Sequence, residues 1–196
     1  PEDASETTRS EKTICPAGYY CVGGEKFECP AGSLGEAGGL WNPTCDGQCP
    51  RGYYCVGGEK HECGSVDKYC PAGSSAPTNV TTGHYSGPSD VNENVRYEET
   101  LCPVGYYCVG GEKFECASGY FGNSTGLTTS QCSGMCKDGY YCESGSTRDD
   151  QHECGSVDKY CPAGSETPLV VPDGYYSGPE DASETTRSEK TICPAG

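Results

Sequence analysis

The sequence predicts a small disulfide-rich fold: serial short β-hairpin modules with much irregular structure and little or no helix, arranged as an elongated repeat rod. Three observations lead to this prediction. Seventeen of the 196 residues are cysteine, whereas the chain has one Met, one Trp and three Phe. The mean hydropathy is −0.66, so the chain lacks the apolar side chains for a conventional core. In addition, Pro1–Gly18 returns letter for letter as Pro179–Gly196.

The return of the opening letters at Pro179 is typical of a tandem repeat, and we expect the chain to be a window on a longer periodic polymer. The period contains two similar halves, because ICPAGYYCVGGEKFEC at Ile14–Cys29 recurs as LCPVGYYCVGGEKFEC at Leu101–Cys116. Each half splits again, since a C-x-x-G-Y-Y-C frame occurs four times. The expected organisation is module 1 with a leading linker at 1–48, module 2 with a Pro/Gly/Ser/Thr-rich linker at 49–101, module 3 at 102–135, module 4 with its linker at 136–178, and the start of the next repeat at 179–196.

The cysteines keep the same register in both halves, apart from one insertion before Cys154. Modules of about 35–45 residues are too small to be stable through burial alone, so we expect cross-links to stabilise them. Such a cysteine density indicates an oxidising compartment, hence a secreted or cell-surface protein. The predicted disulfide cysteines are Cys15, Cys21, Cys29, Cys45, Cys49, Cys55, Cys63, Cys70, Cys102, Cys108, Cys116, Cys132, Cys136, Cys142, Cys154, Cys161 and Cys193.

Four cysteines in a module allow three pairings, and the sequence does not choose among them. We favour the interlocked pattern, first with third and second with fourth, because it restrains a small module better than nested loops. In the opening module this means Cys15–Cys29 and Cys21–Cys45, and in the next module Cys49–Cys63 and Cys55–Cys70. Cys193 stands where Cys15 stands, so we expect its partner in a following repeat.

Each module is expected to contain one hairpin. A Tyr-Tyr pair preceding a cysteine predicts a short strand, and the Gly-Gly pairs at 23–24, 57–58 and 110–111 predict two-residue reversals with positive φ. We interpret the tyrosine rings and the half-cystines as the core of each module; a ligand-stacking platform is the alternative. The cysteine-free stretches Pro71–Leu101 and Pro162–Ile192 share a Y-S-G-P-x-D frame, which indicates ordered, extended contacts between successive units.

Sites for modification are more evident than sites for catalysis. Asn79-Val-Thr81 and Asn123-Ser-Thr125 satisfy the N-glycosylation pattern. Weaker O-glycosylation signals are the Thr and Ser clusters at 7–10, 81–82 and 128–130.

The net charge of −16 makes nucleic acid an improbable partner and indicates a solvated, self-repelling surface, with weak Ca²⁺ binding as the alternative. His61, His84 and His152 show no ligand spacing, and we find no catalytic triad or carboxylate pair, so we expect neither a metal site nor an enzyme. The sequence contains no apolar run long enough to span a membrane.

The motifs C-P-A-G-Y-Y-C at Cys15–Cys21, C-P-x-G-Y-Y-C at Cys49–Cys55 and Cys102–Cys108, and C-P-A-G-S at Cys70–Ser74 and Cys161–Ser165 resemble the ephrin-receptor-like cysteine-rich repeats. The resemblance covers nearly the whole chain. It implies tandem arrays in secreted or surface proteins, distantly similar to the disulfide-bonded rods of tumour-necrosis-factor-receptor and epidermal-growth-factor-like modules, and it brings no catalytic residues. Lys137 and Asp138 depart from the usual Pro-x after Cys136, which leaves the pairing in the fourth module least defined.

These features favour one functional hypothesis: the chain is the structural repeat unit of an extracellular glycosylated filament, an appendage or cell-coat fibre whose main partner is itself. A first alternative is the stalk or ligand-binding ectodomain of a surface receptor or adhesin. A second is an accessory array in a secreted enzyme. Fibres with an axial periodicity would support the filament, whereas isolated short particles would favour the alternatives.

Overall fold

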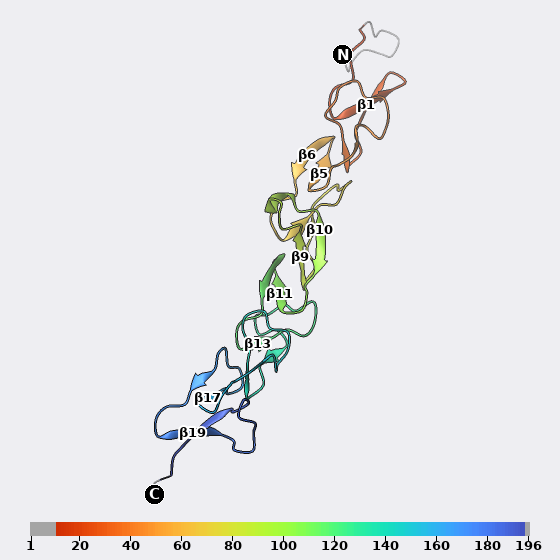
Figure 1. Ribbon diagram of the computed structural model, residues 1–196. Coiled ribbons are helices and arrows are strands. Elements are labelled where there is room, and N and C mark those ends of the chain that lie inside the picture. The colour runs from red at the N-terminus through yellow and green to blue at the C-terminus, as the bar shows by residue number, and fades with distance from the viewer. Residues whose placement is uncertain (1–10, 195–196) are drawn as a thin grey trace. The chain divides into compact units, whose positions relative to one another are not determined.

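The computed structural model describes residues 11–194, and the described chain is built from short two-stranded antiparallel hairpins joined by turns (Figure 1). This confirms the predicted small disulfide-rich class. The described residues form two compact units, one within Pro1–Asn79 and Pro88–Glu98, the other within Val80–Gly87 and Glu99–Gly196. A short 3-10 turn, η2, spans Glu93–Val95.

The first ten strands are β1 (Tyr19–Val22), β2 (Glu25–Glu28), β3 (Ser33–Leu34), β4 (Gly47–Gln48), β5 (Tyr53–Val56), β6 (Glu59–Glu62), β7 (Lys68–Tyr69), β8 (Thr78–Asn79), β9 (His84–Gly87) and β10 (Glu98–Leu101). Those that follow are β11 (Tyr106–Val109), β12 (Glu112–Glu115), β13 (Tyr120–Phe121), β14 (Gly134–Met135), β15 (Tyr140–Tyr141), β16 (His152–Glu153), β17 (Lys159–Tyr160), β18 (Leu169–Val170), β19 (Tyr175–Gly178) and β20 (Glu189–Ile192). Each strand pairs with one other strand.

The Gly-Gly pairs form the tips of the three longest module hairpins, as expected. At the first tip Gly23 and Gly24 have φ values of +61° and +83°, and the strands pair with Tyr20 opposite Phe27. The tips of β5–β6 and β11–β12 repeat this geometry. Positive φ at both central residues matches the right-handed twist of the flanking strands, which explains why glycine is used twice.

The buried core consists of half-cystine side chains. Every apolar side chain that is buried among the described residues belongs to a cysteine, and most of these cysteines are at most 2% exposed. The expectation that tyrosine rings share the core is therefore wrong in part: the Tyr-Tyr pairs of all four module hairpins are only half-buried. Strands of two to four residues place too few side chains on one face to enclose a ring completely.

Eight disulfides link neighbours in sequence: the first cysteine of a module pairs with the second, and the third with the fourth. The favoured interlocked pairing is therefore wrong. The bonds are Cys15–Cys21, Cys29–Cys45, Cys49–Cys55, Cys63–Cys70, Cys102–Cys108, Cys116–Cys132, Cys136–Cys142 and Cys154–Cys161, and Cys193 is free and exposed.

A local turn explains the observed pairing. After Cys15 the chain reverses, because the Tyr19 amide donates to the Pro16 carbonyl oxygen at 3.3 Å and Gly18 adopts a φ of +82°. This type II turn brings the Cα atoms of Cys15 and Cys21 to 5.8 Å, within the range of a disulfide. The interlocked prediction considered only loop entropy and overlooked that a tight turn had already joined the nearest cysteines.

Peptide mapping tests this pairing. Trypsin is expected to release Thr13–Lys26 from the non-reduced protein as a free peptide, two hydrogen atoms lighter than its reduced form, because Cys15 and Cys21 bond to each other. The measurement is mass spectrometry before and after reduction. If the peptide instead emerged linked to the fragment that carries Cys29 and Cys45, the interlocked pattern would be restored.

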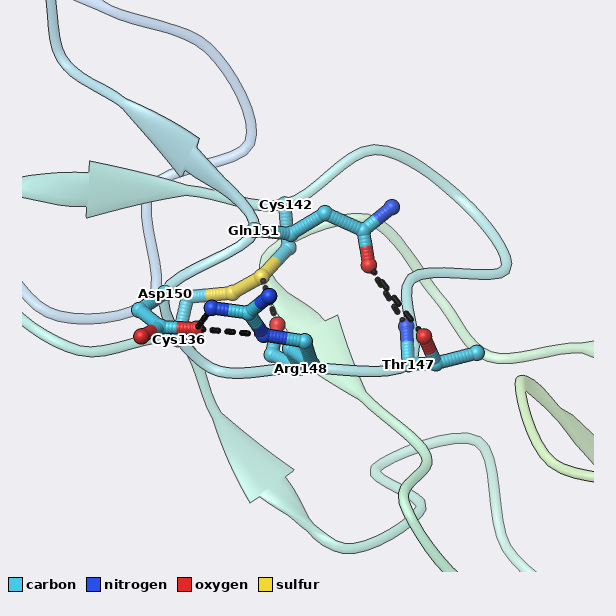
Figure 2. Close-up of polar contacts among 6 residues, drawn as sticks. All are labelled: Cys136, Cys142, Thr147, Arg148, Asp150 and Gln151. Carbon is cyan, nitrogen blue, oxygen red and sulfur yellow. Dashed lines mark hydrogen bonds and ion pairs between the residues drawn. A yellow bond between two sulfur atoms is a disulfide. The ribbon is translucent and has the colours of Figure 1, made fainter.

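The fourth module keeps its fold despite the insertion. The turn after Cys136 forms with Lys137 and Asp138 in place of Pro-x, because the Tyr140 amide still donates to the Lys137 carbonyl oxygen. Figure 2 shows how the inserted loop is held: the Arg148 guanidinium pairs with the Asp150 carboxylate at 2.6 Å, and the Thr147 amide donates to Oε1 of Gln151 at 2.9 Å. These contacts lie within the loop itself, and the fourth module has the same disulfide pairing as the other modules.

Candidate functional site

The feature that recurs most often is a turn, and it occurs more often than the four predicted modules. Outside the paired strands, in eleven places the residue after a glycine donates its amide to the carbonyl oxygen three residues earlier. The glycines have φ values between +76° and +84°, the requirement of a type II turn. They are Gly18, Gly32, Gly52, Gly73, Gly83, Gly105, Gly119, Gly139, Gly145, Gly164 and Gly174.

Most of these turns lie directly against a later part of the chain. A Cβ atom built on Gly83 would lie 2.6 Å from the carbonyl oxygen of Gly126, and one built on Gly119 would lie 2.5 Å from that of Gly164. Only a residue without a side chain permits this approach. Successive turns therefore stack backbone on backbone, which explains how a chain with few apolar side chains can still pack.

A second contact joins the tip of a hairpin to an earlier segment. The Gly35 amide donates to the Gly58 carbonyl oxygen at 2.9 Å, and Leu34 forms a parallel bridge with Gly58. In the second unit the Ser86 amide donates to the Gly111 carbonyl oxygen at 3.0 Å, and Tyr85 bridges to Gly111 in the same way. We call this arrangement the tip contact.

The fourth module makes the hydrogen bond of the tip contact without the parallel bridge, and a serine stands in place of glycine at the accepting position. There the Gly122 amide donates to the Ser146 carbonyl oxygen at 2.9 Å, and Ser146 is 1% exposed. Ser146 turns its own hydroxyl to the Glu143 carbonyl oxygen at 2.7 Å, which satisfies the buried hydroxyl. The three tip contacts have nearly equal separations in sequence, from Gly35 to Gly58, from Ser86 to Gly111 and from Gly122 to Ser146.

The tyrosine pairs support each hairpin from two sides. The second tyrosine of a pair stacks across the hairpin, on Phe27 or Phe114 in two modules and on His61 or His152 in the others, with ring centroids 5.1–5.4 Å apart. Lys113 lies over the rings of both Tyr106 and Tyr85, at 4.9 and 5.0 Å from their centroids. A lysine therefore reaches from its own hairpin to the segment that donates the tip contact.

The predicted modification sites lie on the surface. Asn79 is exposed on β8 and Asn123 is exposed after β13, where the Asn123 backbone amide donates to the Ser133 hydroxyl at 3.1 Å. Both asparagine side chains are accessible to a transferase. The clusters at 81–82 and 128–130 are also on described chain, whereas the cluster at 7–10 lies outside the described residues.

Each of the three histidines makes its own local contact. His61 and His152 stack on tyrosines, and Nδ1 of His84 lies 3.4 Å from the Thr82 carbonyl oxygen. Among residues 11–194, no group of three or more His, Cys, Asp or Glu side chains is arranged to hold a metal ion. The Ser156 hydroxyl donates to the Asp158 carboxylate and lowers the pKa of this exposed side chain. Over the same residues, no helix has the length and apolar character needed to cross a bilayer.

Sequence reasoning missed the tip contact and the count of turns. The spacing C-x-x-G before Tyr or Ser, present at Cys29, Cys70, Cys116 and Cys161 as well as in the Tyr-Tyr frames, was a signal that could have revealed additional turns. The tip contact has no sequence motif, because its donors are the backbone amides of Gly35, Ser86 and Gly122, which lie in different sequence contexts. Comparison of the chain with family models and with curated proteins finds no match.

Proposed function

We propose that this chain is the structural repeat unit of an extracellular, glycosylated protein filament. The observation that carries the proposal is the tip contact, a backbone hydrogen bond that three hairpins make to an earlier segment at nearly constant separation in sequence. A contact that recurs along the chain is suited to propagating an array, because each repeat buries its surface against its neighbour. Eight disulfides indicate an oxidising compartment such as the cell exterior.

The backbone nature of the contact also favours a structural role. Turns that stack through carbonyl oxygens and glycine Cα atoms leave most charged side chains at the surface, and the net charge is −16. Strong like charge keeps such surfaces solvated and opposes lateral clumping. The chain can therefore extend along its repeat while remaining soluble along its sides.

Electron microscopy of the native secreted material tests the filament. We expect uniform fibres with an axial periodicity that corresponds to one repeat, Pro1–Gly178. Isolated short particles, or arrays that end in a different globular domain at a membrane, would instead support the stalk of a receptor or adhesin.

The glycan part of the proposal has its own test. Expressed through a eukaryotic secretory pathway, the chain is expected to carry N-glycans at Asn79 and Asn123, because both acceptors are exposed. Intact mass before and after enzymatic removal of N-glycans measures occupancy. The variants Thr81→Ala and Thr125→Ala should each lose one glycan, whereas Thr44→Ala, in the Asn-Pro-Thr triplet that proline disqualifies, should lose none. Full-length protein of unmodified mass would contradict this part.

A further inference from the structure

The last hairpin repeats the segment that donates a tip contact. His84-Tyr85-Ser86-Gly87-Pro88 recurs as Tyr175-Tyr176-Ser177-Gly178-Pro179, and in both copies a turn glycine precedes the strand. The Cys102 amide donates to the Gly83 carbonyl oxygen at 2.9 Å, and the Cys193 amide donates to the Gly174 carbonyl oxygen at the same distance. The strands β9 and β19 therefore start their hairpins in the same hydrogen-bond register, although the copies differ at the proline that follows, where the Gly178–Pro179 peptide bond is cis.

This geometry fixes the direction of the Ser177 amide. In an antiparallel strand, the N–H and C=O groups of one residue point toward the paired strand, and those of the next residue point to the opposite edge. Gly174 faces β20 through its carbonyl, and Ser177, three residues later, points its amide to the other side, as Ser86 does when it bonds to Gly111. The Ser177 hydroxyl donates to the Val157 carbonyl oxygen at 2.7 Å, which fixes the side chain and leaves the amide facing outward from the hairpin.

The two copies differ in what covers them. His84 and Tyr85 are half-buried beneath the β11–β12 hairpin, whereas Tyr175 and Tyr176 are exposed, at 40% and 38%. A pocket of about 680 Å³ opens beside them, lined by Val157, Val171 and residues 172–177. The face formed by Tyr175 and Tyr176 is therefore exposed, whereas the equivalent face formed by His84 and Tyr85 is covered by a hairpin.

The first hairpin shows the complementary difference. Gly58 and Gly111, which accept the tip contact in their hairpins, are buried, whereas the equivalent Gly24 is exposed and a Cβ atom built on it meets nothing within 4 Å. The register agrees with this. Since Pro179 is the equivalent of Pro1, Gly24 of the next repeat follows Ser177 at the same separation in sequence at which Gly111 follows Ser86.

We propose that Ser177 donates a tip contact to Gly24 of the next repeat along the same polypeptide, with Tyr176 bridging to Gly24 and Lys26 lying over the Tyr176 ring. The proposal rests on the proposed function, since it requires the repeat to continue. Lys26 is the equivalent of Lys113, whose ammonium lies 5.0 Å from the centroid of Tyr85. The contact joins one period to the next by the geometry already used inside each period.

The test compares the 196-residue chain with the same chain continued by its own residues 19–178. In the continued chain, the Ser177 amide is expected to exchange with solvent hydrogen at least about tenfold more slowly. NMR with selectively labelled serine measures the rate, and chemical iodination of Tyr176 should fall in parallel. Equal exchange rates in the two chains would overturn the contact even if the native material forms fibres, so its failure is distinguishable from failure of the filament.

A pair of variants in the added repeat localises the contact. Gly24→Asn is expected to return Ser177 to the exchange rate of the single chain, because Asn tolerates positive φ but its side chain meets the donor segment; at the equivalent Gly58, a Cβ atom would lie 3.2 Å from Cα of the donor residue Gly35. Gly23→Asn, on the adjacent residue, makes the favoured Asn-Gly tip and should leave protection unchanged. Equal effects of both variants, or protection of Ser177 in the single chain that rises with protein concentration, would overturn the proposal; the latter would point to a separate chain as the occupant.

Discussion

Complete reduction of the disulfides is expected to unfold the described chain. Half-cystines are its only buried apolar side chains, so no other core replaces them when the bonds are cut. A disulfide contributes about 2–4 kcal/mol, so the eight together contribute on the order of 16–32 kcal/mol. Net stabilities of domains are about 5–15 kcal/mol, which is less than this sum.

The measurement is amide hydrogen exchange after reduction and alkylation in buffer without denaturant. Protection at the tip-contact donors Gly35, Ser86 and Gly122 should disappear, and the near-ultraviolet circular dichroism of the tyrosine stacks should be lost with it. The control is protein treated with the alkylating reagent alone, which should modify Cys193 and leave the hairpins intact. Retained protection in the reduced chain would refute the view that sulfur forms the core.

Gly139→Ala is expected to destabilise its turn much more than the matched change Gly174→Ala. Both glycines sit at the same position of a type II turn, with φ values of +81° and +84°. An alanine in this conformation costs about 1–2 kcal/mol at either site. At Gly139 the new Cβ atom would also overlap the Thr186 carbonyl oxygen, whereas at Gly174 nothing lies within 4 Å. Such overlap with backbone adds about 1–3 kcal/mol.

The difference is measured locally, because long repeat arrays do not unfold in one step. The Cys161 amide, which donates to the Arg187 carbonyl oxygen at 2.8 Å, reports on the contact next to Gly139. Its exchange is expected to accelerate about 100-fold in Gly139→Ala, a loss of about 3 kcal/mol, and to change little in Gly174→Ala. Equal acceleration in both variants would mean that φ strain alone decides the cost and that the backbone contact contributes nothing.

The local structure of this chain could be predicted from its residues alone. Gly-Gly between two short polar strands determined hairpin tips such as Gly23–Gly24, and the density of cysteine against one Met and three Phe determined a disulfide-rich fold without a conventional core. Both inferences succeed because they depend on the conformational freedom of single residues and on the number of apolar side chains, which are properties of composition and short spacing.

The contacts between residues far apart in the sequence could not be predicted and became evident from the folded chain. Loop-length reasoning favoured Cys15 with Cys29, but a type II turn places Cys15 at Cys21, and the tip contacts use backbone groups of residues as different as Gly35, Ser86 and Gly122. A backbone amide is present at every residue except proline, so the letters cannot show which one faces a carbonyl oxygen. That choice follows from strand direction and from the stacking of turns, which exist only once the chain has folded.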